Sequence, residues 1–183
     1  MKILVLGIGN VLYSDEGIGV HFSKYIEKKY SFSSPNHEIS FIDGGTLANL
    51  LIPIIAEYDH LVVIDCIDAD DGEIGDVYFF DYDNMPKKLS WSGSAHEIEM
   101  LQTLQFMELY GDMPKTKILG VIPERIVPMQ YFLSDTLQNS VKTMEKTLID
   151  YFLSLGFAIE QKNNIIINDI VDELKKAQYD STI

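Results

Sequence analysis

The chain has 183 residues, of which 46% are hydrophobic and 23% are charged. These proportions are typical of a globular domain and exclude extensive disorder. With 14 Lys and Arg against 28 Asp and Glu, the formal net charge is −14, which disfavours binding to nucleic acid or to an anionic membrane surface. A partner with a basic segment would instead be attracted.

No segment has the pattern of a secretory signal or a membrane helix. The apolar start, Lys2–Gly7, is short and runs into polar residues without a cleavage site, and no apolar run approaches about 18 residues. The single cysteine, Cys66, excludes an intramolecular disulfide and a cysteine-rich zinc site. We expect a cytoplasmic protein without membrane insertion, and a monomer.

Apolar runs alternate with segments of helical periodicity along the chain. Buried strands are predicted at Lys2–Gly7, His60–Cys66 and Lys117–Ile122, and a strand of alternating pattern at Glu38–Ile42. Helices are predicted at Gly17–Tyr30, Leu47–Tyr58 (with a break at Pro53), Glu97–Tyr110 and Ser134–Leu155. Asp76–Tyr82 alternates like an antiparallel edge strand. The pattern predicts an α/β fold, a single three-layer αβα sandwich around a mostly parallel, twisted sheet.

Two segments fall outside this alternation. Asn84–Ala95 is predicted to be a long loop, and loops of that length are often functional. Residues 1–162 are predicted to form the domain, and residues 163–183 a C-terminal extension of unknown role. A charged, helix-like stretch in this extension predicts either a docked appendage or a frayed end.

A dinucleotide site is disfavoured at the first loop. Gly7-Ile8-Gly9 follows the first strand, and Asp43 stands where a ribose ligand would. However, Leu12 occupies the place of the third glycine. Asp15 and Glu16 also lie at the start of the helix, where a pyrophosphate requires free N–H groups and no anions.

Acidic residues instead gather at the carboxyl edge of the predicted sheet. Glu16 follows the first strand and Asp65 lies at the end of the third, and the carboxyl ends of parallel strands share one edge. Such carboxylates repel one another unless a cation joins them. His96, at the end of the long loop, is the candidate third ligand. This donor set suits nickel, zinc, iron or manganese better than calcium.

Each of these residues also has a structural explanation. Asp15 or Glu16 would complement a helix dipole, and a single His before a helix is more often a cap. Asp65 is harder to explain this way, because a buried charge is costly without a partner. Four other residues are assigned to structure: His21, His37, His60 and Cys66. The residues alone therefore predict a metal-binding α/β protein, with hydrolase as one candidate activity.

Several segments together form a more specific pattern: Gly7-Ile8-Gly9-Asn10, Asp15-Glu16-Gly17-Ile18-Gly19, Asp43-Gly44-Gly45-Thr46, Asp65, His96 and Gly120-Val121-Ile122-Pro123-Glu124. In order and spacing, from Met1 to about Gly156, this pattern resembles the maturation endopeptidases of nickel-iron hydrogenases. The resemblance implies an enzyme that removes a C-terminal extension from the hydrogenase large-subunit precursor after nickel insertion. Nickel bound in the precursor would serve for recognition, and another divalent metal would be able to occupy the site in isolation.

The resemblance also implies roles for individual residues. Glu16, Asp65 and His96 would be both metal ligands and catalytic residues, while Asp43 would help to shape the cleft. Two mechanisms stay open: a metal that polarises the scissile carbonyl or activates water, and a carboxylate acid–base pair of the aspartic type. The acidic run Asp68–Asp71 is heavier than the family pattern, and would attract a basic substrate tail or solvate a turn.

Two other functions are alternatives. One is another metal-dependent hydrolase on the same fold, which would turn over small substrates without a protein partner. The other is a non-catalytic, nickel-dependent binding module for the large subunit. Such a module would bind the nickel-loaded precursor without shortening it.

Overall fold

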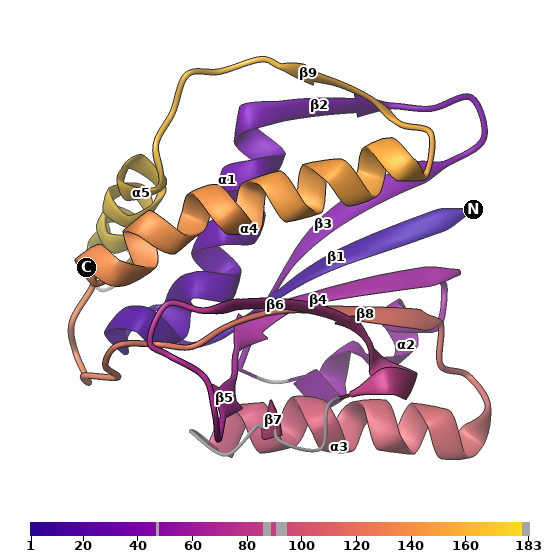
Figure 1. Cartoon of the computed structure of the whole chain (residues 1–183), viewed down its shortest axis with the longest axis horizontal. Coiled ribbons are helices and arrows are strands. Elements are labelled where there is room, and N and C mark those ends of the chain that lie inside the picture. Colours follow the sequence, from indigo (N-terminus) through magenta and orange to yellow (C-terminus); the bar gives the residue numbers. More distant parts are fainter. Residues whose placement is uncertain (47, 86–88, 91–94, 181–183) are drawn as a thin grey trace.

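A five-stranded sheet in the order β3-β1-β4-β8-β6 forms the centre of the computed structural model (Figure 1). Its strands are β1 (Lys2–Ile8), β3 (Glu38–Gly45), β4 (His60–Cys66), β6 (Val77–Asp81) and β8 (Lys115–Val121). The first four strands of that order are parallel, and β6 pairs antiparallel with β8 at the edge. The predicted α/β class and its antiparallel edge strand are confirmed.

The structure describes the backbone of residues 1–46, 48–85, 89–90 and 95–180. It describes the side chains of the same residues except 48, 89–90, 95–99 and 178–180. Within this part of the chain, no helix has both the length and the apolar character needed to cross a membrane.

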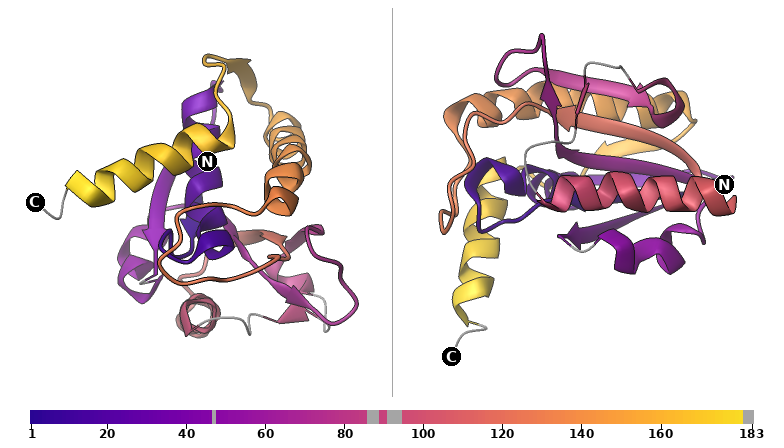
Figure 2. Two further views of the ribbon diagram at one scale, coloured as in Figure 1. Left: turned by 90° about the vertical axis from the view of Figure 1, so that its left-hand side faces the viewer. Right: turned by 90° about the horizontal axis from the view of Figure 1, so that it is seen from below.

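Helices cover both faces of the sheet and complete three layers (Figures 1 and 2). On one face lie α1 (Ile18–Lys29), α4 (Asp135–Ser154) and α5 (Ile167–Asp180), and on the other lie α2 (Ile52–Ile55) and α3 (Ala95–Tyr110). Short 3-10 helices are η1 (Ser14–Gly17), η2 (Ala48–Leu51) and η3 (Tyr82–Asn84). Two small antiparallel sheets pair β2 (Tyr30–Ser33) with β9 (Ala158–Gln161), and β5 (Asp68–Ala69) with β7 (Leu89–Ser90).

The apolar strands supply side chains to two separate cores. In β1, Ile3 and Val5 pack towards α1 and α4, whereas Leu4 and Leu6 pack towards α3. Successive side chains of a strand point to opposite faces, so a central strand covered on both sides must be apolar at nearly every position. This requirement explains why β1 and β4 are continuous hydrophobic runs.

Local differences from the predicted elements have simple causes. The predicted helix at Leu47–Tyr58 is instead η2 followed by one turn of α2, whose first turn contains Pro53; proline fits there because that turn uses no N–H donor.

Ser134 caps α4 as predicted, accepting a hydrogen bond from the N–H of Leu137. Phe152 of α4 is fully buried, whereas Tyr151 is half-buried. Most of the predicted loop Asn84–Ala95 lies outside the described residues.

The segment after residue 162 docks on the rest of the chain. Ile167, Ile170 and Val171 are buried in the same core as α1 and α4. On the surface, Glu173 pairs with Lys24 and Lys28 of α1, and Figure 2 shows α5 lying beside α1. Of the two alternatives for this segment, the docked appendage is observed as far as the described residues reach. The domain boundary at residue 162 stays a prediction.

Glu145 of α4 ties α4 to α1 and β2. Its carboxylate accepts hydrogen bonds from Tyr25 Oη at 2.8 Å, from Lys29 Nζ at 2.7 Å and from the hydroxyl of Tyr30. Burial alone would raise the pKa of Glu145. The hydrogen bonds from Lys29, Tyr30 and Tyr25 outweigh burial and lower that pKa. The folded state therefore favours the charged form.

We expect Glu145→Gln to lower the free energy of unfolding at pH 7 by about 2 kcal/mol, because charge-assisted hydrogen bonds become neutral ones. A pKa lowered by folding gives stabilisation that is complete above the unfolded pKa, about 4.3, and is lost as the pH falls through the folded pKa. Urea titrations should therefore show the variant approaching the wild type below about pH 4. Asp150→Asn, which breaks an exposed pair with Lys146, should change stability by less than about 0.5 kcal/mol. A pH-independent cost of Glu145→Gln would contradict this account.

Candidate active site at the carboxyl edge of the sheet

Two buried carboxylates lie at the carboxyl edge of the parallel strands. Glu16 is in η1, the first element after β1, and is 2% exposed. Asp65 is the penultimate residue of β4 and is fully buried. Because β1 and β4 are neighbouring parallel strands, the structure brings the two acids to one edge, as predicted.

Glycines allow η1 and α1 to reach this edge. A Cβ on Gly19 would lie 2.2 Å from the carbonyl oxygens of both Ile8 and Ile64, so the first turn of α1 packs directly on the ends of β1 and β4. Gly9 has a φ of +137°, and a Cβ there would lie 1.9 Å from the carbonyl oxygen of Glu16. Gly9, one of the glycines that suggest a dinucleotide loop, therefore allows the backbone of Glu16 to approach closely.

Asp15 holds the loop between β8 and α4. Its Oδ2 accepts hydrogen bonds from the N–H groups of Glu124 at 3.0 Å and Arg125 at 3.1 Å, and its Oδ1 accepts one from Ser134 at 2.7 Å. The neighbouring Ser14 hydroxyl donates to the carbonyl oxygen of Arg125 and accepts from the N–H of Val127. The sequence pattern does not predict this role, because it indicates Asp15 only as a first-turn acid that would complement the helix dipole.

Glu16 differs from Asp15 in what surrounds its carboxylate. Glu16 Oε1 is buried and receives no hydrogen bond from any residue that the structure describes. A buried carboxylate oxygen without a donor is costly, and a cation or a proton would relieve that cost. The two adjacent acids thus have different surroundings: Asp15 accepts three backbone N–H groups, whereas Glu16 Oε1 accepts none from the described residues.

Asp65 is connected to the same segment. Its Oδ1 accepts a hydrogen bond from the N–H of Cys66 at 2.8 Å. The thiol of Cys66 is buried in the core and donates to the carbonyl oxygen of Asp15 at 3.3 Å. Cys66 is structural, as expected, and it links the β4 end that carries Asp65 to the turn that carries Glu16.

His96 is the second residue of α3, but its side chain lies outside the described residues. Its assignment as third ligand therefore stays a prediction. Among the side chains that the structure does describe, no three His, Cys, Asp or Glu residues form a group that could hold a metal.

The other candidates lie around this edge or away from it. Asp43 Oδ1 accepts a hydrogen bond from the N–H of Gly45, whose carbonyl oxygen accepts one from Gly9, so Asp43 shapes a turn that contacts the first loop. His21 is buried on α1, where burial, with a smaller contribution from Lys24, lowers its pKa to about 4.

The fold and the site together define an α/β protein with an acidic site at the carboxyl edge of its sheet. A model of the hydrogenase maturation protease family matches residues 20–151. Protein HydD of Wolinella succinogenes is 47% identical over 152 residues, which cover 82% of this chain and 95% of the relative. The chain belongs to the hydrogenase maturation protease family.

Two further comparisons agree. The hydrogenase 2 maturation protease of Escherichia coli K12 is 33% identical over 129 residues, covering 70% of this chain and 77% of that protein. The solved structure of the hydrogenase maturating endopeptidase HybD from E. coli superposes with a TM-score of 0.77 at 27% identity, covering 88% of this chain and 98% of that chain.

Proposed function

We propose that this chain is an endopeptidase that removes a C-terminal extension from the precursor of a nickel-iron hydrogenase large subunit after nickel insertion. Membership of the family and the 33% identity to the hydrogenase 2 maturation protease of E. coli support a maturation protease. The observation that carries the proposal furthest is the buried Glu16 Oε1, which accepts no hydrogen bond from a described residue. We further propose that the enzyme acts as a cytoplasmic monomer.

The nickel is proposed to arrive as part of the substrate. Glu16 and Asp65, with His96 as the predicted third ligand, form a set of two oxygen donors and one nitrogen donor that suits a divalent transition metal. A divalent cation would offset the negative charges of both Glu16 and Asp65, whereas one proton, even when shared by the two carboxylates, would remove a single charge. We therefore favour the metal-assisted version over an acid–base pair of aspartic type.

The residues of the chain would act in two ways. Glu16 and Asp65 would orient the nickel-bearing segment against the edge of the sheet, and a bound metal would polarise the scissile carbonyl. A carboxylate oxygen not engaged by the cation would accept the proton of the attacking water. The buried setting strengthens these electrostatic interactions because little water screens them.

The intact mass of a purified large-subunit precursor, nickel-loaded or nickel-free, after incubation with this protein tests the proposal. We expect only the nickel-loaded form to lose a short C-terminal fragment. Shortening of both forms would contradict nickel-based recognition. Binding of the nickel-loaded form without loss of mass would instead indicate a non-catalytic binding module.

A further inference from the structure

Among the described residues, strand β6 forms an edge of the central sheet that no further strand covers. It pairs with β8 on its inner side and is the last strand of the order β3-β1-β4-β8-β6. No described strand pairs with its outer side, and Figures 1 and 2 show β6 at the margin of the sheet, between the layers of α3 and α4. Unpaired strand edges present rows of N–H and C=O groups that can pair with another chain.

The hydrogen bonds around β8 identify the outward backbone groups of β6. The carbonyl oxygen of Val121 accepts a hydrogen bond from the N–H of Ile67, which follows β4, so the backbone groups of Val121 face β4 and not β6. The N–H of the next residue, Ile122, donates to the carbonyl oxygen of Asp76, so Ile122 faces the β6 side. Backbone groups alternate in direction along a strand. Gly120 and Ile118 therefore bond to their partners Tyr78 and Phe80. The residues whose backbone groups point outward are Val77, Phe79 and Asp81.

The open edge lies close to the candidate active site. Asp65 is level with Gly120 of β8, and Gly120 is level with Tyr78 of β6. A strand added outside β6 would lie three strand spacings, about 14 Å, from Asp65. An extended chain rises about 3.3 Å per residue. About four or five residues would therefore reach from the added strand to the site.

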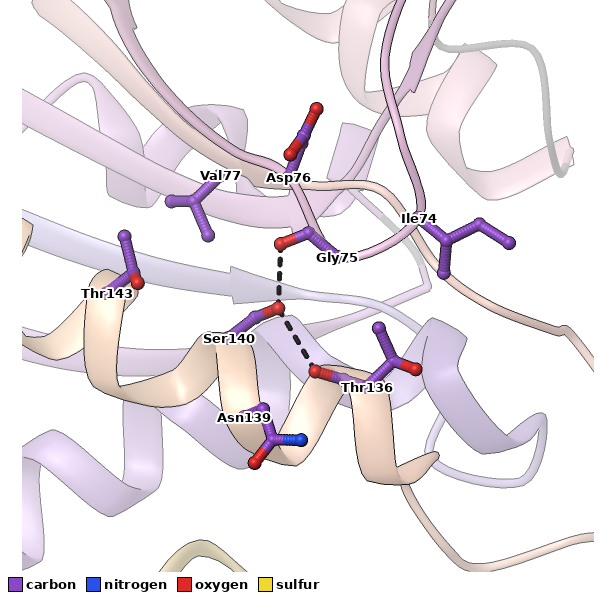
Figure 3. A pocket seen from close by; sticks show the side chains of 8 residues that line it. All are labelled: Ile74, Gly75, Asp76, Val77, Thr136, Asn139, Ser140 and Thr143. Carbon is purple, nitrogen blue, oxygen red and sulfur yellow. Dashed lines mark hydrogen bonds between the residues drawn. The ribbon is translucent and has the colours of Figure 1, made fainter.

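A groove runs beside the start of this edge (Figure 3). It has a volume of about 530 Å³ and lies between the turn that leads into β6 and one face of α4. The Ser140 hydroxyl fixes its floor by donating to the carbonyl oxygens of Gly75 at 2.7 Å and Thr136 at 3.1 Å. Asn139 and Thr143 also line the groove, so it offers polar contacts to side chains of an added strand.

The charge around the edge favours a basic occupant. Glu73 and Asp76 precede β6, and Asp83 follows it; all three residues are exposed. Asp81 lies at the far end of the strand and pairs with Lys117 at 2.8 Å. The chain as a whole carries a formal charge of −14. A positively charged segment would therefore be attracted to this side of the sheet.

We propose that the outer edge of β6 docks an extended, basic segment of the large-subunit precursor next to the cleaved bond, as a sixth strand of the sheet. Main-chain hydrogen bonds to Val77, Phe79 and Asp81 would supply affinity, and the groove against α4 would select side chains, as in other cases of strand addition. The inference rests on the proposed function, because it takes the occupant to be the substrate of that site.

Hydrogen exchange of the full chain, observed by NMR, tests the docking mode. The probe is a synthetic peptide that spans the cleaved bond of the precursor, added at millimolar concentration. We expect the amides of Val77, Phe79 and Asp81 to exchange at least about tenfold more slowly with the peptide, while Tyr78 and Phe80 change little because β8 already protects them. Unchanged exchange at the three outward amides would overturn the proposal. Protection of the same amides in a dimer without peptide would also overturn it and would assign the edge to a second copy.

A matched pair of variants tests the role of the edge in cleavage. Val77→Pro removes an outward N–H at the first residue of an edge strand, where proline is tolerated, and Val77→Ala removes a similar part of the side chain but keeps the N–H. With nickel-loaded precursor, we expect Val77→Pro to raise KM at least about tenfold with little change in kcat, and Val77→Ala to stay within about threefold. Equal effects of the two variants would overturn strand addition while leaving the protease assignment intact. Failure of the wild type to cleave the precursor would overturn the proposed function as well.

Discussion

Glu16→Gln is expected to reduce cleavage of the nickel-loaded precursor by at least about 100-fold, because even residues that only support metal ligands commonly account for about 10- to 100-fold. The same variant should fold at least as stably as the wild type. Glu16 Oε1 receives no hydrogen bond from a described residue, and a neutral amide costs less to bury than a carboxylate. Its Tm should be unchanged or higher by up to about 4 °C, the shift that about 1 kcal/mol produces in a chain of this size.

Intact-mass kinetics and thermal unfolding measured on the same samples check both halves of this expectation. Glu27→Gln is the matched control, since it makes the same chemical change at an exposed position of α1 and should alter neither quantity. His96→Ala should also abolish processing, which would test the third predicted ligand independently. Normal processing by both Glu16→Gln and His96→Ala would remove these residues from the site.

Hydrophobic periodicity was sufficient to predict the central sheet. Strands such as His60–Cys66 are buried on both faces, and that constraint leaves a continuous apolar run with bounds that match the structure. The pairing of β2 with β9 was not predicted. It joins Tyr30 to Gln161 across most of the chain, and four-residue segments with exposed positions carry too little periodicity to indicate a partner so distant in sequence.

In the candidate site, the sequence predicts where the acidic residues lie but not what each of them does. The position of Glu16 and Asp65 at one edge follows from the parallel direction of β1 and β4, which the alternation of strands and helices predicts. The different roles of Asp15 and Glu16 do not follow from their types, because both are acids in the first turn after a glycine loop. Only tertiary structure shows that Asp15 is surrounded by the N–H groups of Glu124, Arg125 and Ser134.

Asp15→Asn is expected to lower both stability and activity. Glu16→Gln, in contrast, is expected to lower activity without lowering stability. An amide keeps one oxygen acceptor, whereas the carboxylate of Asp15 receives three backbone N–H groups on two oxygens. At least one buried donor would then lose its partner or face another donor, at a cost of about 2 kcal/mol or more. For a chain of this size, Tm should fall by about 4–8 °C.

The loss of activity should exceed what unfolding explains. Asp15 positions the turn that carries Glu16 relative to the β8–α4 loop, and through Cys66 relative to the strand that carries Asp65. Below the lowered Tm, where the variant is fully folded, kcat for the nickel-loaded precursor should still fall by about tenfold or more, since small displacements of catalytic groups are costly. Ser14→Ala, which removes a hydroxyl contact to the same loop but no contact of Asp15, serves as the comparison and should have a smaller effect on kcat. If Asp15→Asn lowered Tm but left kcat unchanged, Asp15 would stabilise the fold without positioning the site.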